Sequence, residues 1–347
     1  MRFYRGTHAY YGGIDLHART MYLRLSDQQG RILVDQNLRC EPAAFLDAIG
    51  PFKHDLVVTA ECIFCWYWLA DLCRAHGITF VLAHALYLKA IHGGKAKNDP
   101  LDADKLLVLL RAGAIPMAYV YPPEMRATRD LMRRRLFFTR KRAELFTHIQ
   151  NTFHQYNLLK PAGDIHRASY RAQLAACFSD PIVRATIEAD LQVCTVYDAL
   201  IKNLEKTIEQ QARVHDPTAF LLLKTIPGIG KVLGLTILYE IHTINRFPRV
   251  QDFSSYCRLV KPAHTSAGKR VGSGGSKIGS AHLKWAFSEA AVSFLHGNPR
   301  GQAFIKGMRK RYGPGKALSI LANRLARAAY FMLKQHRAFD AQRFFVT

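Results

Sequence analysis

Four acidic side chains stand where they could gather around metal ions. Asp15 follows Gly12-Gly13-Ile14 in a predicted strand, and Glu61 closes a second, apolar predicted strand. Asp99 and Asp102 are three residues apart at a predicted helix start, so they share one helix face. Mg²⁺ takes carboxylate oxygens, and two such ions activate the attacking oxygen and stabilise the leaving oxygen in phosphodiester chemistry. The four acids therefore predict a catalytic site for Mg²⁺ (or Mn²⁺) that acts on a nucleic acid.

A purely structural interpretation of these acids stays open. Asp99 and Pro100 also make a good helix start, with Asp99 as the N-cap and Pro100 at the first helical position. Asp15 is then an ordinary strand acid, and Glu61 is a surface acid. We favour the metal site because the four acids occur together in a part of the chain whose net charge differs from that of the rest.

Charge divides the 347 residues into two parts. Lys and Arg number 49 against 26 Asp and Glu, a formal net charge of +23. Residues 1–104 hold 11 basic and 11 acidic side chains, so the remainder carries the whole excess. A body this basic predicts a polyanionic partner, and we expect a catalytic module joined to one that holds nucleic acid.

The elements that must position these acids follow a mixed α/β pattern. Apolar alternation and turn residues predict strands at 9–17, 21–26, 31–38, 55–61 and 78–83, with helices at 42–50, 64–76 and 102–113. This order is the one expected of a ribonuclease-H-like domain, by fold analogy.

The rest of the chain is predicted to be mostly helical. A basic helix is expected at about 124–157, and a second helix at 181–214. The second helix carries a possible coiled-coil seam that Asp190 interrupts. The seam residues are Ile187, Cys194, Tyr197, Ile201, Leu204 and Ile208. After Pro217 a mostly helical unit is expected to begin, with a Gly/Ser/Lys-rich stretch at 264–280.

Three basic segments are candidates for contact with phosphates. The first is the pair of clusters Arg133-Arg134-Arg135 and Arg140-Lys141-Arg142, whose alternative is a solvated or partner-packed helix. The second is the turn Ile226-Pro-Gly-Ile-Gly, where Gly228, Gly230 and Lys231 resemble a helix–hairpin–helix phosphate contact, with a tight packing turn as the alternative. The third is the stretch around Ser266, which carries Lys269, Arg270 and Lys277.

Ser266 could attack a phosphate while Lys269 and Arg270 neutralise the phosphoryl oxygens. By residue types alone, a phosphate-binding loop without a covalent step is the favoured interpretation. The seven cysteines form no framework, and Cys62-x-x-Cys65 lacks a second ligand pair, so buried free thiols in a cytoplasmic protein are expected. The sequence contains no run of 18 apolar residues, so no membrane span is predicted.

The landmarks together resemble a known family. Gly13-Ile14-Asp15, Glu61, Lys97-Asn98-Asp99 with Asp102-Ala103, Ile226–Gly230 and Ser266 match, in order and spacing, the insertion-sequence transposases of the IS110 group, to which the pilin-gene invertase Piv is related.

The resemblance implies a RuvC-like α/β domain at 1–120 with a DEDD metal site formed by Asp15, Glu61, Asp99 and Asp102. It implies a helical, coiled-coil dimerisation region at 121–216, and a C-terminal transposase domain at 217–347 whose nucleophile is Ser266. It also implies an RNA-guided recombinase that acts on donor and target DNA through a phosphoserine link. The assembly would be a homo-oligomer, a dimer to tetramer, with sites shared between subunits. Two alternatives stay open: a metal-dependent nuclease or junction resolvase that uses water, and a non-catalytic nucleic-acid scaffold.

Overall fold

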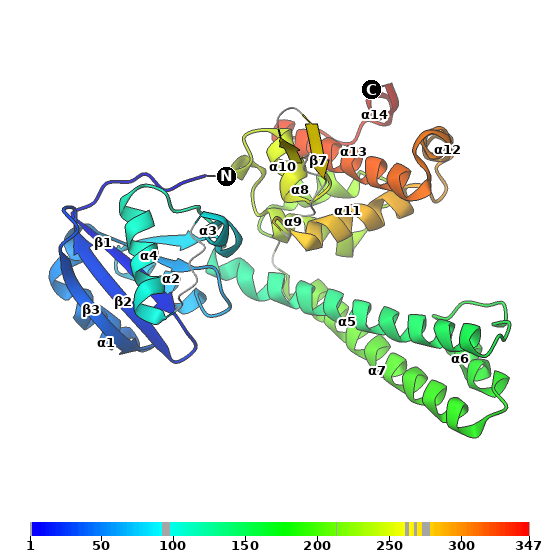
Figure 1. The fold of residues 1–347 in the computed structure, drawn as a ribbon. Helices are drawn as coiled ribbons and strands as arrows, with labels where there is room; N and C mark the ends of the chain where they lie inside the picture. Colours follow the sequence, from blue (N-terminus) through cyan, green and yellow to red (C-terminus); the bar gives the residue numbers. More distant parts are fainter. Residues whose placement is uncertain are drawn as a thin grey trace. The chain divides into compact units, whose positions relative to one another are not determined.

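The chain folds into two compact units. The computed structural model describes residues 2–91, 98–212, 214–260, 264–266, 269–272 and 278–346. The units are Met1–Glu124 and Met125–Thr347 (Figure 1). The finer division into three domains, with boundaries at 120 and 216, stays a prediction.

The first unit is built on one mixed sheet of five strands, as predicted. The strands are β1 (Tyr10–Leu16), β2 (Thr20–Asp27), β3 (Ile32–Arg39), β4 (Leu56–Glu61) and β5 (Thr79–Ala83). Their order across the sheet is β3-β2-β1-β4-β5. β1, β4 and β5 run parallel, and β2 is antiparallel to both of its neighbours. This arrangement is compatible with the predicted ribonuclease-H-like fold.

Helices cover both faces of the sheet. They are α1 (Pro42–Ile49), α2 (Tyr67–Ala75), α3 (Ala85–Ile91) and α4 (Asp99–Arg111), with a short 3₁₀ helix, η1, at Gly50–Asp55. On one face, Phe45 of α1 and Leu69 of α2 pack with Ile14 and Val58. On the other face, leucines of α4 pack with alternate residues of the same strands, such as Tyr11 and Val57. Because strand side chains alternate, burial on both faces makes β4 mostly apolar before Glu61.

Two long helices run antiparallel in the second unit. They are α5 (Pro123–Gln155) and α7 (Pro181–Gln211), linked through α6 (Ala168–Leu174) and the 3₁₀ helix η2 (Ala175–Cys177) (Figure 1). Three ion pairs give the direction, since the α5 number rises as the α7 number falls: Arg135–Glu205, Arg142–Asp198 and His148–Asp190.

The buried residues of α7 recur every seven positions. They are Ile187, Cys194, Ile201 and Ile208, so four of the six predicted seam residues are buried. Asp190, which interrupts the seam in the sequence, bonds to His148 of α5, with 2.5 Å between its Oδ2 and the ring Nδ1. Supercoiling of these helices stays a prediction.

The remainder of the second unit is helical around one core. Its helices are α8 (Pro217–Lys224), α9 (Lys231–Ile241), the 3₁₀ helix η3 (Ile244–Arg246), α10 (Val250–Tyr256), α11 (Ala281–Phe294), α12 (Pro299–Tyr312), α13 (Pro314–Gln335) and α14 (Ala341–Val346). Phe253, Phe287, Phe294 and Leu325 are fully buried at its centre.

Two expectations need correction. The stretch at 264–280 includes a two-stranded sheet, β6 (His264–Ser266) and β7 (Lys269–Gly272), rather than loop alone. Cys62 is exposed and Cys65 half-buried, so this pair is not the buried one expected. Separately, within the described residues, no helix has both the length and the apolar character that a membrane crossing requires.

Candidate active site

A close approach between β1 and α4 joins two of the elements that carry the acids. Gly13 of β1 faces α4, and a Cβ atom at Gly13 would lie 2.2 Å from the carbonyl oxygen of Ala103 and 2.5 Å from the backbone nitrogen of Leu107. Both neighbours are helix backbone, so no change of side-chain rotamer relieves this overlap. Glycine at position 13 therefore allows the start of α4 to lie against the end of β1.

Asp15 and Glu61 lie on the sheet face that α4 covers. Tyr11 of β1 packs in the core beneath α4, and Asp15, four residues later, points to the same face. β1 and β4 are parallel neighbours, with Ile14 opposite Ala60. Asp15 and Glu61 follow directly on the two strands, and residues opposite each other in a sheet share a face.

The first turn of α4 carries the other two acids. Asn98 is the N-cap, and its side-chain oxygen accepts a hydrogen bond of 2.9 Å from the Leu101 backbone N–H. The interpretation of Asp99 as the N-cap is therefore wrong by one residue: Asp99 is the first helical residue and Pro100 the second. Because Asn98 caps the helix, the Asp99 carboxylate can serve another purpose.

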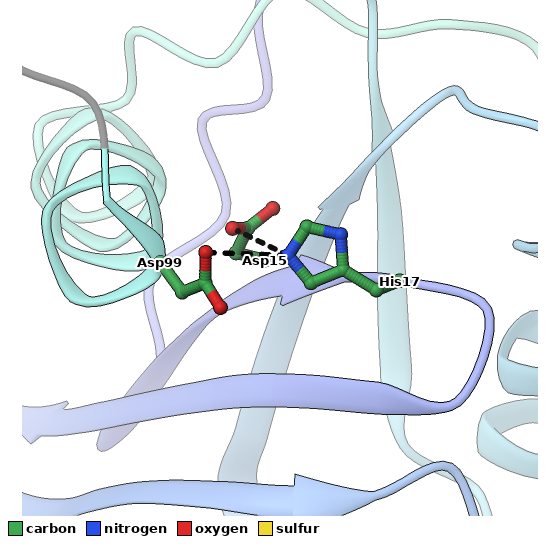
Figure 2. A group of neighbouring side chains, drawn as sticks. All are labelled: Asp15, His17 and Asp99. Atoms are coloured by element: carbon green, nitrogen blue, oxygen red, sulfur yellow. Dashed lines mark ion pairs between the residues drawn. The ribbon is translucent and has the colours of Figure 1, made fainter.

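The carboxylates of Asp99 and Asp15 both contact the ring of His17. The Nε2 atom of His17 lies 3.2 Å from Oδ2 of Asp15 and 3.4 Å from Oδ1 of Asp99 (Figure 2). One ligand atom from each of the three residues lies within 4.8 Å of the others. The Asp15 side chain is 20% exposed and the Asp99 side chain 47%, so the cluster opens to solvent at the end of the sheet.

Glu61 and Asp102 lie outside this group of three. Glu61 is half-buried at the end of β4. Asp102 bonds to Lys105 one turn along α4, with 2.8 Å between Oδ1 and Nζ. The structure thus brings Asp15 and Asp99 into one cluster and places Glu61 on the neighbouring strand, while Asp102 pairs locally.

His17 was not among the residues that the sequence suggested. It follows β1, two positions after Asp15, and its backbone N–H donates a 2.9 Å hydrogen bond to the carbonyl of Thr20 in the turn to β2. An Asp-x-His spacing at a strand end was the available signal, since residues two apart share a face.

The donor set suits a divalent cation. Two carboxylates from different elements converge with an imidazole at the solvent-facing end of a sheet. Mg²⁺ and Mn²⁺ accept carboxylate oxygens, and a neutral imidazole nitrogen is a common metal ligand. Like charges held this close repel one another unless a cation or a protonated histidine lies between them.

Ser266 lies in the second unit, at the end of β6. Its Cα partner across the hairpin is Lys269, the first residue of β7. The Lys269 side chain is exposed. Arg270 lies in β7 on the same hairpin, and Lys277 lies outside the described residues. Of the three cations predicted near the serine, Lys269 is the one whose side chain the structure describes.

The cationic clusters of α5 divide into paired and exposed members. Arg133 and Arg135 bond to Glu240 and Glu205 respectively, and Arg142 bonds to Asp198. Lys141 pairs with Glu144 on its own helix at 2.7 Å. Arg134 and Arg140 are exposed, and Arg134 also lies 5.2 Å from the ring centre of Phe137. Phosphate binding by these six residues stays a prediction, and it is best supported for Arg134 and Arg140.

The glycine turn before α9 has an evident packing role. Gly228 has φ of +85°, and a Cβ atom there would lie 2.5 Å from the Phe294 nitrogen of α11. This favours the alternative of a tight packing turn at Gly228. Gly230 is different, because it is the N-cap of α9 and a Cβ atom there would meet nothing within 4 Å. The neighbouring Lys231 lies 3.5 Å from a carboxylate oxygen of Glu209.

Two segments of the chain match known protein families. Residues 12–158 match the DEDD transposase family of IS110 elements, a segment that contains all four predicted acids and His17. Residues 221–306 match the Transposase IS116/IS110/IS902 family, a segment that contains Ser266.

Relatives extend the likeness over nearly the whole chain. The transposase for insertion sequence element IS1111A of Coxiella burnetii is 20% identical over 94% of this chain and 90% of its own length. The transposase for insertion sequence element IS1328 of Yersinia enterocolitica is 27% identical over 42% of this chain and 45% of its own length. The chain therefore belongs to the IS116/IS110/IS902 family of transposases, and the resemblance predicted from its motifs is confirmed.

Proposed function

We propose that this transposase exchanges DNA strands by metal-assisted attack of Ser266 on a DNA phosphodiester. The observation that carries the proposal is the convergence of Asp15, Asp99 and His17 at the end of the sheet, where a cation can bind. Ser266 enters through the family resemblance and through its place opposite Lys269.

The proposed step makes one bond and breaks one. The Oγ of Ser266 bonds to phosphorus, and the bond from phosphorus to a deoxyribose oxygen breaks. The serine hydroxyl loses its proton, and the departing deoxyribose oxygen gains one. The exposed ammonium of Lys269 would stabilise the negative charge that grows on the phosphoryl oxygens. Reversal of this step on a second DNA end completes the exchange.

The acids of the first unit would hold the metal. Asp15 and Asp99 would be ligands, with Glu61 on the adjacent strand and Asp102 one helical turn away as the remaining members of the set. When bound, Mg²⁺ or Mn²⁺ lowers the pKa of an attacking hydroxyl and neutralises the leaving oxygen. Asp102 must release Lys105 to contribute.

A guide RNA would supply the choice of DNA sequence. This part of the proposal rests on the family resemblance, and the charge of +23 supports it because two nucleic acids must be held at once. The second unit would then need few residues that read bases. The observation that tests it is RNA copurifying with the chain, and strand exchange that is lost after ribonuclease treatment and restored by that RNA.

The decisive experiment is the search for a covalent adduct. The full chain, with end-labelled element DNA, the element's RNA and Mg²⁺, should leave DNA bound to protein under denaturing conditions. Ser266→Ala should abolish both the adduct and strand exchange. Ser288→Ala on α11, whose hydroxyl bonds to the Lys284 carbonyl, is the matched control and should behave like the parent chain.

The outcomes separate the alternatives. Cleavage that survives Ser266→Ala without any adduct indicates a nuclease or resolvase that uses water. Tight binding without metal-dependent cleavage indicates a scaffold. For the metal itself, Mn²⁺ binding measured by electron paramagnetic resonance should be lost in Asp15→Asn and Asp99→Asn. It should persist in Asp104→Asn, a change on the same helix at a residue that pairs with Arg24.

A further inference from the structure

A buried carboxylate lies between the basic helix α5 and Ser280, the residue before α11. Glu240 of α9 is 2% exposed. Its Oε1 accepts a 2.6 Å hydrogen bond from Nε of Arg133, and its Oε2 accepts one of 3.0 Å from Nη2 of the same residue. Arg129 adds a longer contact of 3.4 Å from Nη2 to Oε2. Both arginines belong to α5, so Glu240 ties α9 to that helix.

Stability alone does not account for such a group. Burying charge costs several kcal/mol per ion, and apolar replacements of buried ion pairs are often neutral or stabilising. Burial raises the pKa of Glu240, but the hydrogen bonds from Arg133 and the charge of Arg129 together outweigh it and hold that pKa below its usual value. The residue is therefore a fixed anion at neutral pH, and a fixed anion orients the donors around it.

One of those donors is Ser280, the N-cap of α11. The Oγ of Ser280 donates to Oε2 of Glu240 at 3.1 Å and accepts from the Leu283 backbone N–H at 3.2 Å. The backbone N–H of Ser280 donates to the carbonyl of Tyr256, the last residue of α10, at 2.7 Å. The adjacent Gly279 has φ of +97°, and a Cβ atom there would lie 2.5 Å from that same carbonyl oxygen.

These contacts close the base of a loop. The chain leaves α10 at Tyr256, passes through the β6–β7 hairpin that contains Ser266, and returns at Ser280. The hydrogen bond between Ser280 and Tyr256 joins the two ends, and Glu240 fixes that junction to α9 and α5. We name Glu240, Ser280 and the Tyr256 carbonyl the loop clamp.

We propose that Glu240 is a positioning residue, which through the loop clamp holds the Ser266 hairpin in place for attack on DNA. The inference rests on the proposed function of Ser266, and it adds a residue that neither the motifs nor the family resemblance singled out. A nucleophile displaced by about 1 Å loses on the order of 100-fold in rate. The clamp therefore acts on the chemical step rather than on the affinity for DNA.

The first test compares two acid-to-amide changes. Glu240→Gln keeps the size of the side chain and removes the charge that holds Arg133 and Ser280. Asp190→Asn is the matched control, because Asp190 is also an acid that joins α7 to α5, with its side chain 16% exposed, and it bonds to His148. His148 lies 15 residues further along α5 than Arg133, about 22 Å at the usual helical rise. Both changes raise the net charge by one, so non-specific DNA binding should change equally.

The expected result is a split between rate and affinity. At saturating DNA, Glu240→Gln should form the Ser266 adduct at least about tenfold more slowly, with a half-saturating DNA concentration within about twofold of the parent chain. Asp190→Asn should keep the parent rate. Equal adduct rates in the parent chain and in Glu240→Gln would overturn the proposal, as would a slow rate that excess DNA fully restores.

A second series keeps the test meaningful if Glu240→Gln folds poorly. Ser280→Ala removes the hydroxyl that bonds to Glu240 and should slow adduct formation. Ser280→Thr retains a hydroxyl and should keep the parent rate. Ser280→Asp keeps a good N-cap for α11 but places a second carboxylate against Glu240, so it should be at least as slow as Ser280→Ala. If Ser280→Asp matches the parent chain, capping of α11 is the only role of Ser280 and the loop clamp is refuted.

Failure of the clamp differs from failure of the proposed function. If the parent chain forms an adduct that Ser266→Ala still forms, the nucleophile is misassigned, and the clamp proposal falls with it. If Ser266→Ala abolishes the adduct while Glu240→Gln and the Ser280 variants leave its rate unchanged, Ser266 stands and the clamp alone is wrong. Thermal unfolding of each variant shows which rate changes occur in folded protein.

Discussion

A Gly13→Ala chain should fold and yet lose most of its activity. The added Cβ atom would lie 2.2 Å from the Ala103 oxygen, whereas a carbon–oxygen contact settles at about 3.3 Å. The start of α4 must therefore move away from β1 by roughly 1 Å. That movement carries Asp99 away from Asp15. A displacement of this size costs on the order of 100-fold in rate when it separates catalytic groups.

The effect on stability should be smaller than the effect on activity. Overpacking of this kind costs typically about 1–3 kcal/mol, and alanine recovers about 0.4–1 kcal/mol by restricting the unfolded chain. The net loss expected is about 1–2 kcal/mol. Urea unfolding monitored by circular dichroism measures this quantity, while Mn²⁺ binding and adduct formation measure the site.

Gly12 provides a matched control in the same strand. A Cβ atom at Gly12 would lie 3.0 Å from Cγ1 of Val58, a side-chain atom that can shift. Gly12 also faces away from α4, because strand residues alternate. Gly12→Ala should bind Mn²⁺ like the parent chain. If Gly13→Ala also keeps parent Mn²⁺ affinity and parent rate, the close approach of α4 does not set the geometry of the site.

Three further outcomes follow from described contacts. Arg134→Ala and Arg140→Ala should each make the negative slope of log K against log salt shallower by about one in DNA or RNA titrations, and a slope equal to that of the parent chain would remove the residue from the interface. Gly228→Ala should lower the unfolding free energy of the second unit by about 1–3 kcal/mol, measured by urea unfolding, since its Cβ atom would meet the backbone of α11. Burial opposes the ionisation of Asp198, but hydrogen bonds from Arg171 and Arg142 outweigh it and lower its pKa. The pKa of Asp198 is therefore lower in the folded chain than in the unfolded chain. The resulting stabilisation is present above about pH 4 and is lost as the pH falls through the folded-state pKa. Asp198→Asn should therefore flatten the acid limb of a plot of stability against pH.

The strands and the acids could be predicted because each rests on a local pattern. β4 is mostly apolar because both of its faces are buried, and the strand ends at the half-buried Glu61. The parallel pairing of β1 and β4 then places Asp15 and Glu61 on neighbouring strands, a relation between residues 46 positions apart. Strand prediction alone does not contain that relation, and only the fold-level analogy supplied it.

Two local features of the site escaped prediction for identifiable reasons. Asn98 and Asp99 are both good N-caps, so the sequence could not decide between adjacent residues, and a shift of one position changes which side chain is released to the site. His17 was not among the predicted residues because the predicted Mg²⁺ chemistry calls for carboxylates, although its place two residues after Asp15 puts it on the same face. The Glu240 contacts with Ser280 and Arg133 span 40 and 107 residues, and no sequence pattern links them.

The basic helix shows why a count of cations overstates a nucleic-acid surface. The sequence places six basic residues in two clusters of α5, and an electrostatic argument alone treats them as equivalent. Three of them bond to acids on α7 and α9, because an antiparallel partner helix and a packed core must be held in register. An arginine that leaves such a pair to bind phosphate leaves a buried or half-buried carboxylate unpaired by it, so the gain from the new contact is offset by the loss of the old one. The phosphate-binding surface of α5 should therefore follow the outward-facing Arg134 and Arg140, while Arg133 acts inward through Glu240.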